Sequence, residues 1–152
     1  MGMKLCGCDN VPNTIKEANL VIDWLDGKKL DLPIFYDIEN INQTLLGKDV
    51  LTYIAKTFCN IITENGYRCG IYANKYFLKE NMNAEELALD YPIWMAHWTG
   101  SNNYDNVLNN LNKFGSDYNL TPYKYWQFSS LGVYNGITEN TVDLDFGYDI
   151  FD

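Results

Sequence analysis

The chain has little histidine, few basic residues and no long apolar run, and each shortage excludes a class of function. His97 is the only histidine in 152 residues, which rules out multi-histidine metal sites and weakens schemes in which a histidine activates a nucleophile. Lys and Arg number 11 against 20 Asp and Glu, for a net charge of −9, so the surface repels nucleic-acid phosphates and anionic lipid. No apolar run reaches membrane-spanning length, and residues 1–10 lack a signal-peptide pattern. We therefore expect no nucleic-acid partner and no membrane insertion.

The four cysteines also lack the spacing of a disulfide framework or a zinc site. Cys6 and Cys8 are separated by a single residue, too close for an ordinary bridge. Cys59 and Cys69 fall at an expected helix end and strand start, where a bridge is one alternative. Burial statistics of cysteine favour free, buried thiols instead.

Aromatic residues are abundant, and the length suits one domain. The chain has 12 Tyr, 7 Phe and 4 Trp. Aromatic rings can stack on the flat faces of sugars, although packing in the core accounts for most of them. We expect residues 1–152 to form a single domain, because 152 residues can bury one core and are too few for two ordinary ones.

Helical and strand patterns alternate along the chain. The first expected helix begins at the capping-box pattern Thr14–Glu17 and ends before Gly27. The other expected elements are a strand at Ile34–Glu39, a helix from Val50 to Asn65, a strand at Cys69–Ala73, a short helix at Ala84–Leu89 and strands at Ile93–Trp98, Tyr123–Phe128 and Val142–Phe146, with an irregular Asn-rich stretch from Thr99 to Tyr118. Strands separated by helices indicate an α/β fold with parallel strands, either a barrel or a doubly wound sheet.

The first expected strand ends in two acids, Asp37 and Glu39. Side chains alternate along a strand, so both acids share one face and their Cα atoms lie about 6.6 Å apart. Catalytic groups collect at the carboxyl ends of parallel strands, and carboxyl groups about 5–5.5 Å apart are typical of retaining glycosidases. An Asp-x-Glu pair alone also fits a solvated strand end, so its context decides.

Four segments in a fixed order supply that context. They are the Pro-led strand Leu32–Glu39, the tripeptide Gly70-Ile71-Tyr72, the Trp-x-Ala-x-aromatic strand Ile93–Trp98, and Trp126-Gln127-Phe128-Ser129 followed by Val142-Asp143-Leu144-Asp145. Together they resemble the glycoside hydrolase family 25 lysozymes over roughly residues 14 to 148. The resemblance implies an irregular (β/α) barrel that cleaves peptidoglycan between N-acetylmuramic acid and N-acetylglucosamine with retention. It also implies action on the cell wall, outside the cell, and glycan strands as partner. No metal and no organic cofactor is implied, because the proton donor and the nucleophile are already supplied.

The same resemblance assigns roles to individual residues. Glu39 falls on the general acid/base, Asp37 on the carboxylate that orients the substrate acetamido group, and Asp143 on a further active-site acid. The positions expected to line the substrate are Tyr72, Trp94, Trp126 and Gln127. His97 could line the same cleft, although an ordinary hydrogen-bonded strand histidine is the better expectation.

Two departures from the family pattern have consequences. Asp145 stands where Asn is usual, and residues 1–11 hold no counterpart of the opening strands, the first of which carries an Asp. We therefore expect a barrel incomplete at its N-terminus that self-associates through exposed sheet edges. Two alternatives to an active muramidase stay open: an impaired relative that only holds peptidoglycan, and another acetamido-assisted glycosidase of the chitinase kind.

Overall fold

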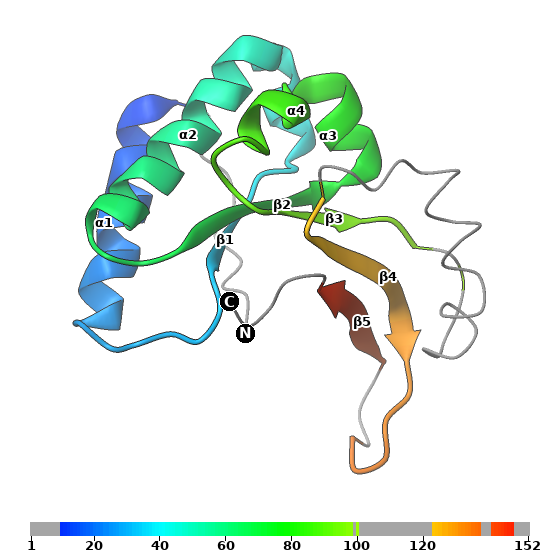
Figure 1. Cartoon of the computed structure of the whole chain (residues 1–152). Coiled ribbons are helices and arrows are strands. Elements are labelled where there is room, and N and C mark those ends of the chain that lie inside the picture. The colour runs from blue at the N-terminus through cyan, green and yellow to red at the C-terminus, as the bar shows by residue number, and fades with distance from the viewer. Residues whose placement is uncertain (1–9, 99, 101–122, 138–140, 148–152) are drawn as a thin grey trace.

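A curled five-stranded sheet with helices on one side forms the framework of the protein (Figure 1). The computed structural model describes residues 10–98, 100, 123–137 and 141–147. The strands, paired in chain order, are β1 (Ile34–Asp37), β2 (Cys69–Asn74), β3 (Ile93–Ala96), β4 (Tyr125–Gly132) and β5 (Val142–Gly147). β1 to β4 are parallel and β5 is antiparallel to β4. The expected α/β class is confirmed, in the form of a half-barrel sheet whose edges, among the described residues, are β1 and β5.

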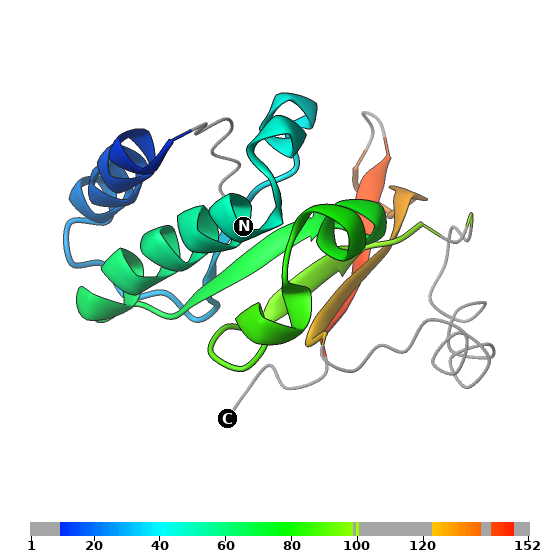
Figure 2. The same cartoon turned by 90° about the horizontal axis from the view of Figure 1, so that it is seen from above.

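The helices cover one face of this sheet. They are α1 (Val11–Leu25), the 3-10 helix η1 (Ile41–Leu46), α2 (Lys48–Glu64), α3 (Lys75–Asn81) and α4 (Ala84–Leu87). α2 lies against β1 and β2, and α1 packs on α2 rather than on the sheet (Figure 2). The opposite face of the sheet carries no described helix, so the side chains there are free to form a site.

α1 begins four residues earlier than the Thr14 capping box predicts, so that expectation is wrong. Asn10 is the cap: its side chain accepts a hydrogen bond from the Asn13 backbone N–H at 3.0 Å, and Pro12 suits a first helical turn that needs no backbone donor. Thr14 lies inside the helix, where its hydroxyl donates back to the Asn10 carbonyl at 3.1 Å. The expected end is confirmed, with Asp26 and Gly27 both in the left-handed conformation.

Two short helices were not expected, and several strand ends differ. η1 is held by a reciprocal cap between Asn40 and Gln43, and Asn74 caps α3. β1 ends at Asp37, so Glu39 lies just beyond the strand, and β3 ends at Ala96. Of the expected irregular stretch Thr99–Tyr118, all but Gly100 lies outside the described residues.

The core lies between the helices and the sheet. Tyr36 of β1 stacks on Phe58 of α2 with ring centroids 4.2 Å apart and planes 10° from parallel. The strands contribute Ile71, Met95, Trp126 and Phe128, Ile38 follows directly after β1, and α2 contributes Leu51, Ile54 and Ile62. Burying such side chains stabilises the fold by about 1.5–3 kcal/mol each. Within the described part of the chain, no helix is long and apolar enough to cross a membrane.

The two described cysteines are free and buried, which confirms that expectation for this pair. Cys59 of α2 and Cys69 of β2 have their Sγ atoms 3.2 Å apart without a bridge. The pKa of the Cys59 thiol is raised, mainly by burial and further by the neighbouring Cys69. Cys6 and Cys8 lie outside the described residues.

Candidate active site

The strand register brings the expected site residues together on the face away from the helices. Across the sheet, Asp37 pairs with Tyr72, and Tyr72 pairs with Trp94. One pleat further toward the carboxyl ends of the parallel strands, Ala96 pairs with Gln127, and Gln127 pairs with Asp145 on the antiparallel β5. Ile38 lies between the two acids of the Asp-x-Glu pair in the sequence, and its side chain is fully buried on the helix side of the sheet. Residues far apart in the sequence therefore meet at one end of one sheet face.

Aromatic rings form the floor of this face. Phe35 of β1 packs edge-on against both Trp94 and Tyr125, in each case with ring centroids 5.1 Å apart. Tyr72 packs edge-on against Trp94 at 4.8 Å. The Phe35 ring can extend across β2 because its neighbour on that strand is Gly70. A Cβ atom at position 70 would lie only 2.6 Å from the Phe35 ring and from the Pro92 carbonyl. The floor needs a residue without a side chain at position 70.

Among the described residues, Glu39 is held by Asn74 at the end of β2. Its Oε2 accepts hydrogen bonds from the Asn74 backbone N–H at 2.7 Å and from the Asn74 Nδ2 at 3.0 Å. The Asn74 Oδ1 in turn accepts the Phe77 N–H at 2.9 Å and so caps α3. Glu39 is half-buried, and its other carboxylate oxygen, Oε1, receives no hydrogen bond from the described residues.

Tyr72 of β2 is half-buried, and four carboxylates influence its ionisation. Burial is the first cause that raises the pKa of Tyr72 well above its usual value, and the charges of Glu39, Asp37, Asp143 and Asp145 follow in that order. The register relates the same residues, because Asp37 pairs with Tyr72, and the Tyr72 hydroxyl donates to Gln127, the β4 partner of Asp145. Tyr72 therefore stays protonated and acts as a hydrogen-bond donor.

The Tyr72 hydroxyl and the Trp98 indole share one acceptor on β4. Tyr72 Oη and Trp98 Nε1 each donate to the Gln127 Oε1 at 3.0 Å. Gln127 is buried, whereas Trp98 is 60% exposed. The amide fixes an otherwise exposed aromatic face beside the acids, an arrangement that suits a sugar ring.

Asp145, noted in the sequence only as a replacement of the usual Asn, also lies at the site. Its Oδ1 accepts the Trp94 Nε1–H at 2.9 Å. Burial raises its pKa from 3.8 to about 6; the Trp94 hydrogen bond opposes this rise, and the charge of Asp143 adds to it. The alternation of Asp143 and Asp145 along β5 was the available signal, because residues two apart on a strand share a face.

Trp126, expected to line the substrate, lies elsewhere. It is 0% exposed and packs in the core on the helix side, and its Nε1 donates to the His97 carbonyl at 2.9 Å. Burial and then the charge of Lys75 lower the pKa of His97. Neither residue joins the acids. The described residues also contain no group of three or more His, Cys, Asp or Glu that could hold a metal ion.

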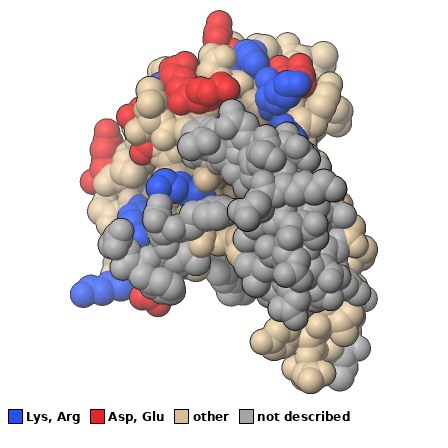
Figure 3. All heavy atoms as spheres, turned by 45° about the vertical axis from the view of Figure 1, so that its right-hand side comes forward, with Lys and Arg blue, Asp and Glu red and all other residues tan. Residues whose placement is uncertain are grey.

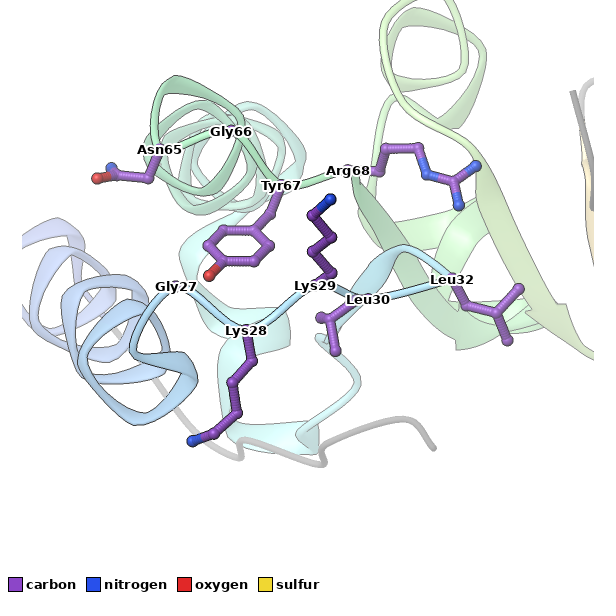
Figure 4. A pocket seen from close by; sticks show the side chains of 9 residues that line it. All are labelled: Gly27, Lys28, Lys29, Leu30, Leu32, Asn65, Gly66, Tyr67 and Arg68. Carbon is purple, nitrogen blue, oxygen red and sulfur yellow. The ribbon is translucent and has the colours of Figure 1, made fainter.

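A separate hollow lies at the opposite end of the sheet, below the starts of β1 and β2. This cavity of about 370 Å³ is lined by residues 27–30, 32 and 65–68. Figure 4 shows the Tyr67 ring between α2 and the loop after α1, with the charged ends of Lys28, Lys29 and Arg68 pointing in three different directions. Cations that do not converge make a poor anion site.

The helical layer carries surface charges of both signs. Figure 3 shows Asp and Glu side chains gathered over this layer with Lys and Arg beside them. Two ion pairs lie here: Lys56 with Glu86 at 2.6 Å and Lys79 with Glu80 at 3.6 Å. Such exposed pairs contribute little stability, and they lie away from the aromatic floor.

A family model matches most of the chain. The family model described as glycosyl hydrolases family 25 matches residues 8–137. A protein of Streptococcus phage B30 named D-alanyl-L-alanine endopeptidase is 28% identical over 131 residues, which is 85% of this chain and 28% of that protein. This chain thus spans less than a third of its relative.

Two solved endolysins share the fold. The CTP1L endolysin matches 95% of this chain and 45% of its own, with a TM-score of 0.67 and 23% identity. The modular Cpl-1 endolysin, solved with a peptidoglycan analogue as a glutamate-to-glutamine mutant, matches 93% of this chain and 38% of its own, with a TM-score of 0.55 and 20% identity.

Proposed function

Because the chain belongs to glycosyl hydrolases family 25, we propose that it hydrolyses the β-1,4 bond between N-acetylmuramic acid and N-acetylglucosamine in peptidoglycan. The observation that carries the proposal is the strand register, which places Asp37 beside Tyr72 and Asp145 beside Gln127, with the Tyr72 hydroxyl donating to Gln127 and Glu39 held by Asn74 at the same sheet end. Hydrolysis of a glycoside needs a proton donor and a second carboxylate within reach of one bond. An aromatic floor beside those acids suits the sugar rings on either side of that bond.

Glu39 is the general acid/base of the proposed reaction, and Asp37 assists it. Protonated Glu39 donates its proton to the glycosidic oxygen, which leaves with the bonding electrons. The acetamido carbonyl oxygen of the muramic acid attacks the anomeric carbon, while Asp37 orients the acetamido N–H and stabilises its developing positive charge. Glu39, now a carboxylate, takes a proton from the water that opens this cyclic intermediate. Two inversions at one carbon give net retention.

Tyr72, Gln127 and the indoles have binding roles in this proposal. Trp94 and the exposed Trp98 provide apolar faces for sugar rings, and each is fixed by an indole hydrogen bond, to Asp145 and to Gln127. Asp143 is exposed on β5, where its carboxylate can accept sugar hydroxyls. Trp126 is left out, because its ring is packed in the core.

Peptidoglycan is the proposed substrate because the relatives point to it. The Cpl-1 endolysin was solved with a peptidoglycan analogue, and the Streptococcus phage relative bears the name of an enzyme that cuts a peptide. We therefore place the action of this chain at the cell wall.

Peptide cleavage is the competing activity, suggested by the name of that relative. The chemistry of the described residues disfavours it: Cys59 and Cys69 are buried thiols, and the charged, reactive form of Cys59 is opposed by burial. The single histidine, His97, follows β3, and its backbone carbonyl accepts the Trp126 indole N–H, whereas Cys59 and Cys69 lie on α2 and β2. Since the chain covers 28% of that relative, its name need not describe the matched segment.

The two activities leave different products, so one digest separates them. Purified peptidoglycan incubated with the protein should gain reducing ends that borohydride converts to reduced muramic acid, with no gain in free amino groups. Reduced glucosamine in its place would identify a glucosaminidase, and new amino groups would identify a peptidase. A chitin oligomer in parallel tests the chitinase alternative. Binding to peptidoglycan without any cleavage would show that the chain is an impaired relative, and the proposal would fail.

A further inference from the structure

Asn74 determines which oxygen of Glu39 can carry a proton. Both donors of Asn74, the backbone N–H and Nδ2, converge on Oε2 at 2.7 and 3.0 Å. An oxygen that accepts two N–H bonds has no room for a proton of its own, and protonation there would set a hydrogen against two donors. Oε1 receives no hydrogen bond from the described residues, so the proton of the acid form belongs on Oε1.

The orientation of the Asn74 amide is itself fixed. Its Oδ1 accepts the Phe77 N–H at 2.9 Å and thereby caps α3. A flip of the amide would place Nδ2 against that N–H and Oδ1 against the Glu39 carboxylate, so it would break two hydrogen bonds at once. The cap of a short helix thus keeps Nδ2 directed at Glu39.

The backbone around Asn74 is equally constrained. Asn74 ends β2 in register with Ala96 of β3, and its neighbours Ala73 and Phe77 are buried. Glu39 follows β1, whose last residue, Asp37, pairs with Tyr72 only two positions before Asn74. Two adjacent parallel strands therefore set the separation between the amide and the carboxylate.

We propose that Asn74 is a positioning residue for Glu39: it holds Oε2 as an acceptor and leaves Oε1 to deliver and recover the catalytic proton. The proposal rests on the function proposed above, in which Glu39 is the general acid/base. Asn74 acts through Glu39 and need not touch the substrate. The other titratable groups near this end of the face are Asp37 on β1, Tyr72 on β2, Lys75 at the start of α3, and Asp143 and Asp145 on β5.

Two substitutions separate this role from helix capping. Asn74→Ser keeps the backbone N–H and a capping oxygen but removes Nδ2, whereas Asn74→Asp keeps the cap and places a second carboxylate against Glu39. Asn10→Ser is the matched control, because Asn10 caps α1 in the same way, accepting the Asn13 N–H. Its helix packs on α2, away from the acids.

The primary measurement is the titration of the Glu39 carboxyl carbon by NMR in ¹³C-Glu-labelled protein, assigned with Glu39→Gln. Losing a donor to the carboxylate should move the midpoint to higher pH by about one unit in Asn74→Ser. The midpoint should move further in Asn74→Asp and stay in place in Asn10→Ser. The alkaline limb of kcat/KM on peptidoglycan should move in the same direction, because it follows loss of the acid's proton.

The result that overturns the proposal is a Glu39 titration in Asn74→Ser that matches the parent protein while amide spectra show α3 intact. If Asn74→Asp fails to fold, the serine variant decides alone. Since the titration needs no turnover, its outcome is independent of the proposed function. If the Glu39 midpoint shifts as expected but the protein releases no reducing ends, the role of Asn74 is supported. Only the proposed muramidase activity is then contradicted.

Discussion

Asp145 carries a charge that the fold opposes, so replacing it by asparagine should stabilise the protein at neutral pH. Burial raises the pKa of Asp145 from 3.8 to about 6, the Trp94 hydrogen bond opposes the rise, and Asp143 adds to it. An asparagine keeps a carbonyl oxygen for the Trp94 Nε1–H and removes the charge. The substitution therefore keeps the hydrogen bond that the folded protein makes at this position.

The size of the effect follows from the shift. About two pKa units correspond to about 3 kcal/mol as an upper bound, and screening by solvent at this partly exposed carboxyl reduces the figure to about 1 kcal/mol. The pKa of Asp145 in the folded protein lies above its unfolded value. The contribution of Asp145 to stability is therefore fully present below about pH 4 and is lost as the pH rises to about 6. Asp145→Asn should therefore match the parent protein near pH 4 and exceed it above pH 6.

Urea unfolding at several pH values from about 4 to about 8 tests this expectation. Asp23→Asn on the exposed side of α1 is the control, and it should leave the pH dependence unchanged. Asp143→Asn should give part of the gain, because it removes the like charge beside Asp145. The reasoning is refuted if Asp145→Asn is less stable than the parent at pH 7. It is also refuted if the free energies of unfolding of the two proteins differ by the same amount at every pH.

Four further expectations follow from the same site and sheet. Glu39→Gln should lower turnover by about three orders of magnitude or more while binding of peptidoglycan persists, as measured by reducing ends and by pull-down. Asp37→Asn should cost less, because part of the orienting hydrogen bonding survives; a sugar trapped covalently on Asp37 would contradict that role. Gly70→Ala should destabilise the fold by about 1–3 kcal/mol in thermal unfolding, because its methyl group would overlap the Phe35 ring and the Pro92 carbonyl. The open edges of β1 and β5 should make the chain self-associate, and light scattering that finds only monomer over a wide concentration range would contradict this.

The fold class could be predicted because burial imposes a readable pattern. Apolar runs such as Ile34–Tyr36 and Ile93–Met95 lie on strands in the structure, and the α2 residues Ile54 and Phe58 are fully buried at helical spacing. Short polar helices leave no such pattern. α3 depends on the Asn74 cap and on two buried side chains, so it was missed.

The residues of the site were harder to predict. Their position depends on the register between strands and on which face of the sheet each side chain points to. Trp126 and Gln127 are adjacent on a strand, so only one of them can face the acids, and the expectation that both line the substrate ignored this alternation. The apolar neighbour at the next like position, Phe128, marks the Trp126 side as the core. Phe35, Asn74 and Tyr125 carry no motif of their own. They join the site because strands pair in a register that the sequence does not display.

The position of the acids ties their chemistry to the open side of the sheet. Asp37 ends β1 and Glu39 follows it, and among the described residues β1 is paired only with β2. A strand added along the free side of β1 would lie beside both acids and exclude water from them. Charge interactions strengthen as water is excluded, so such pairing would strengthen the interactions of both acids with a bound substrate. The edge at which we expect self-association is therefore also the edge beside the two acids of the proposed hydrolysis.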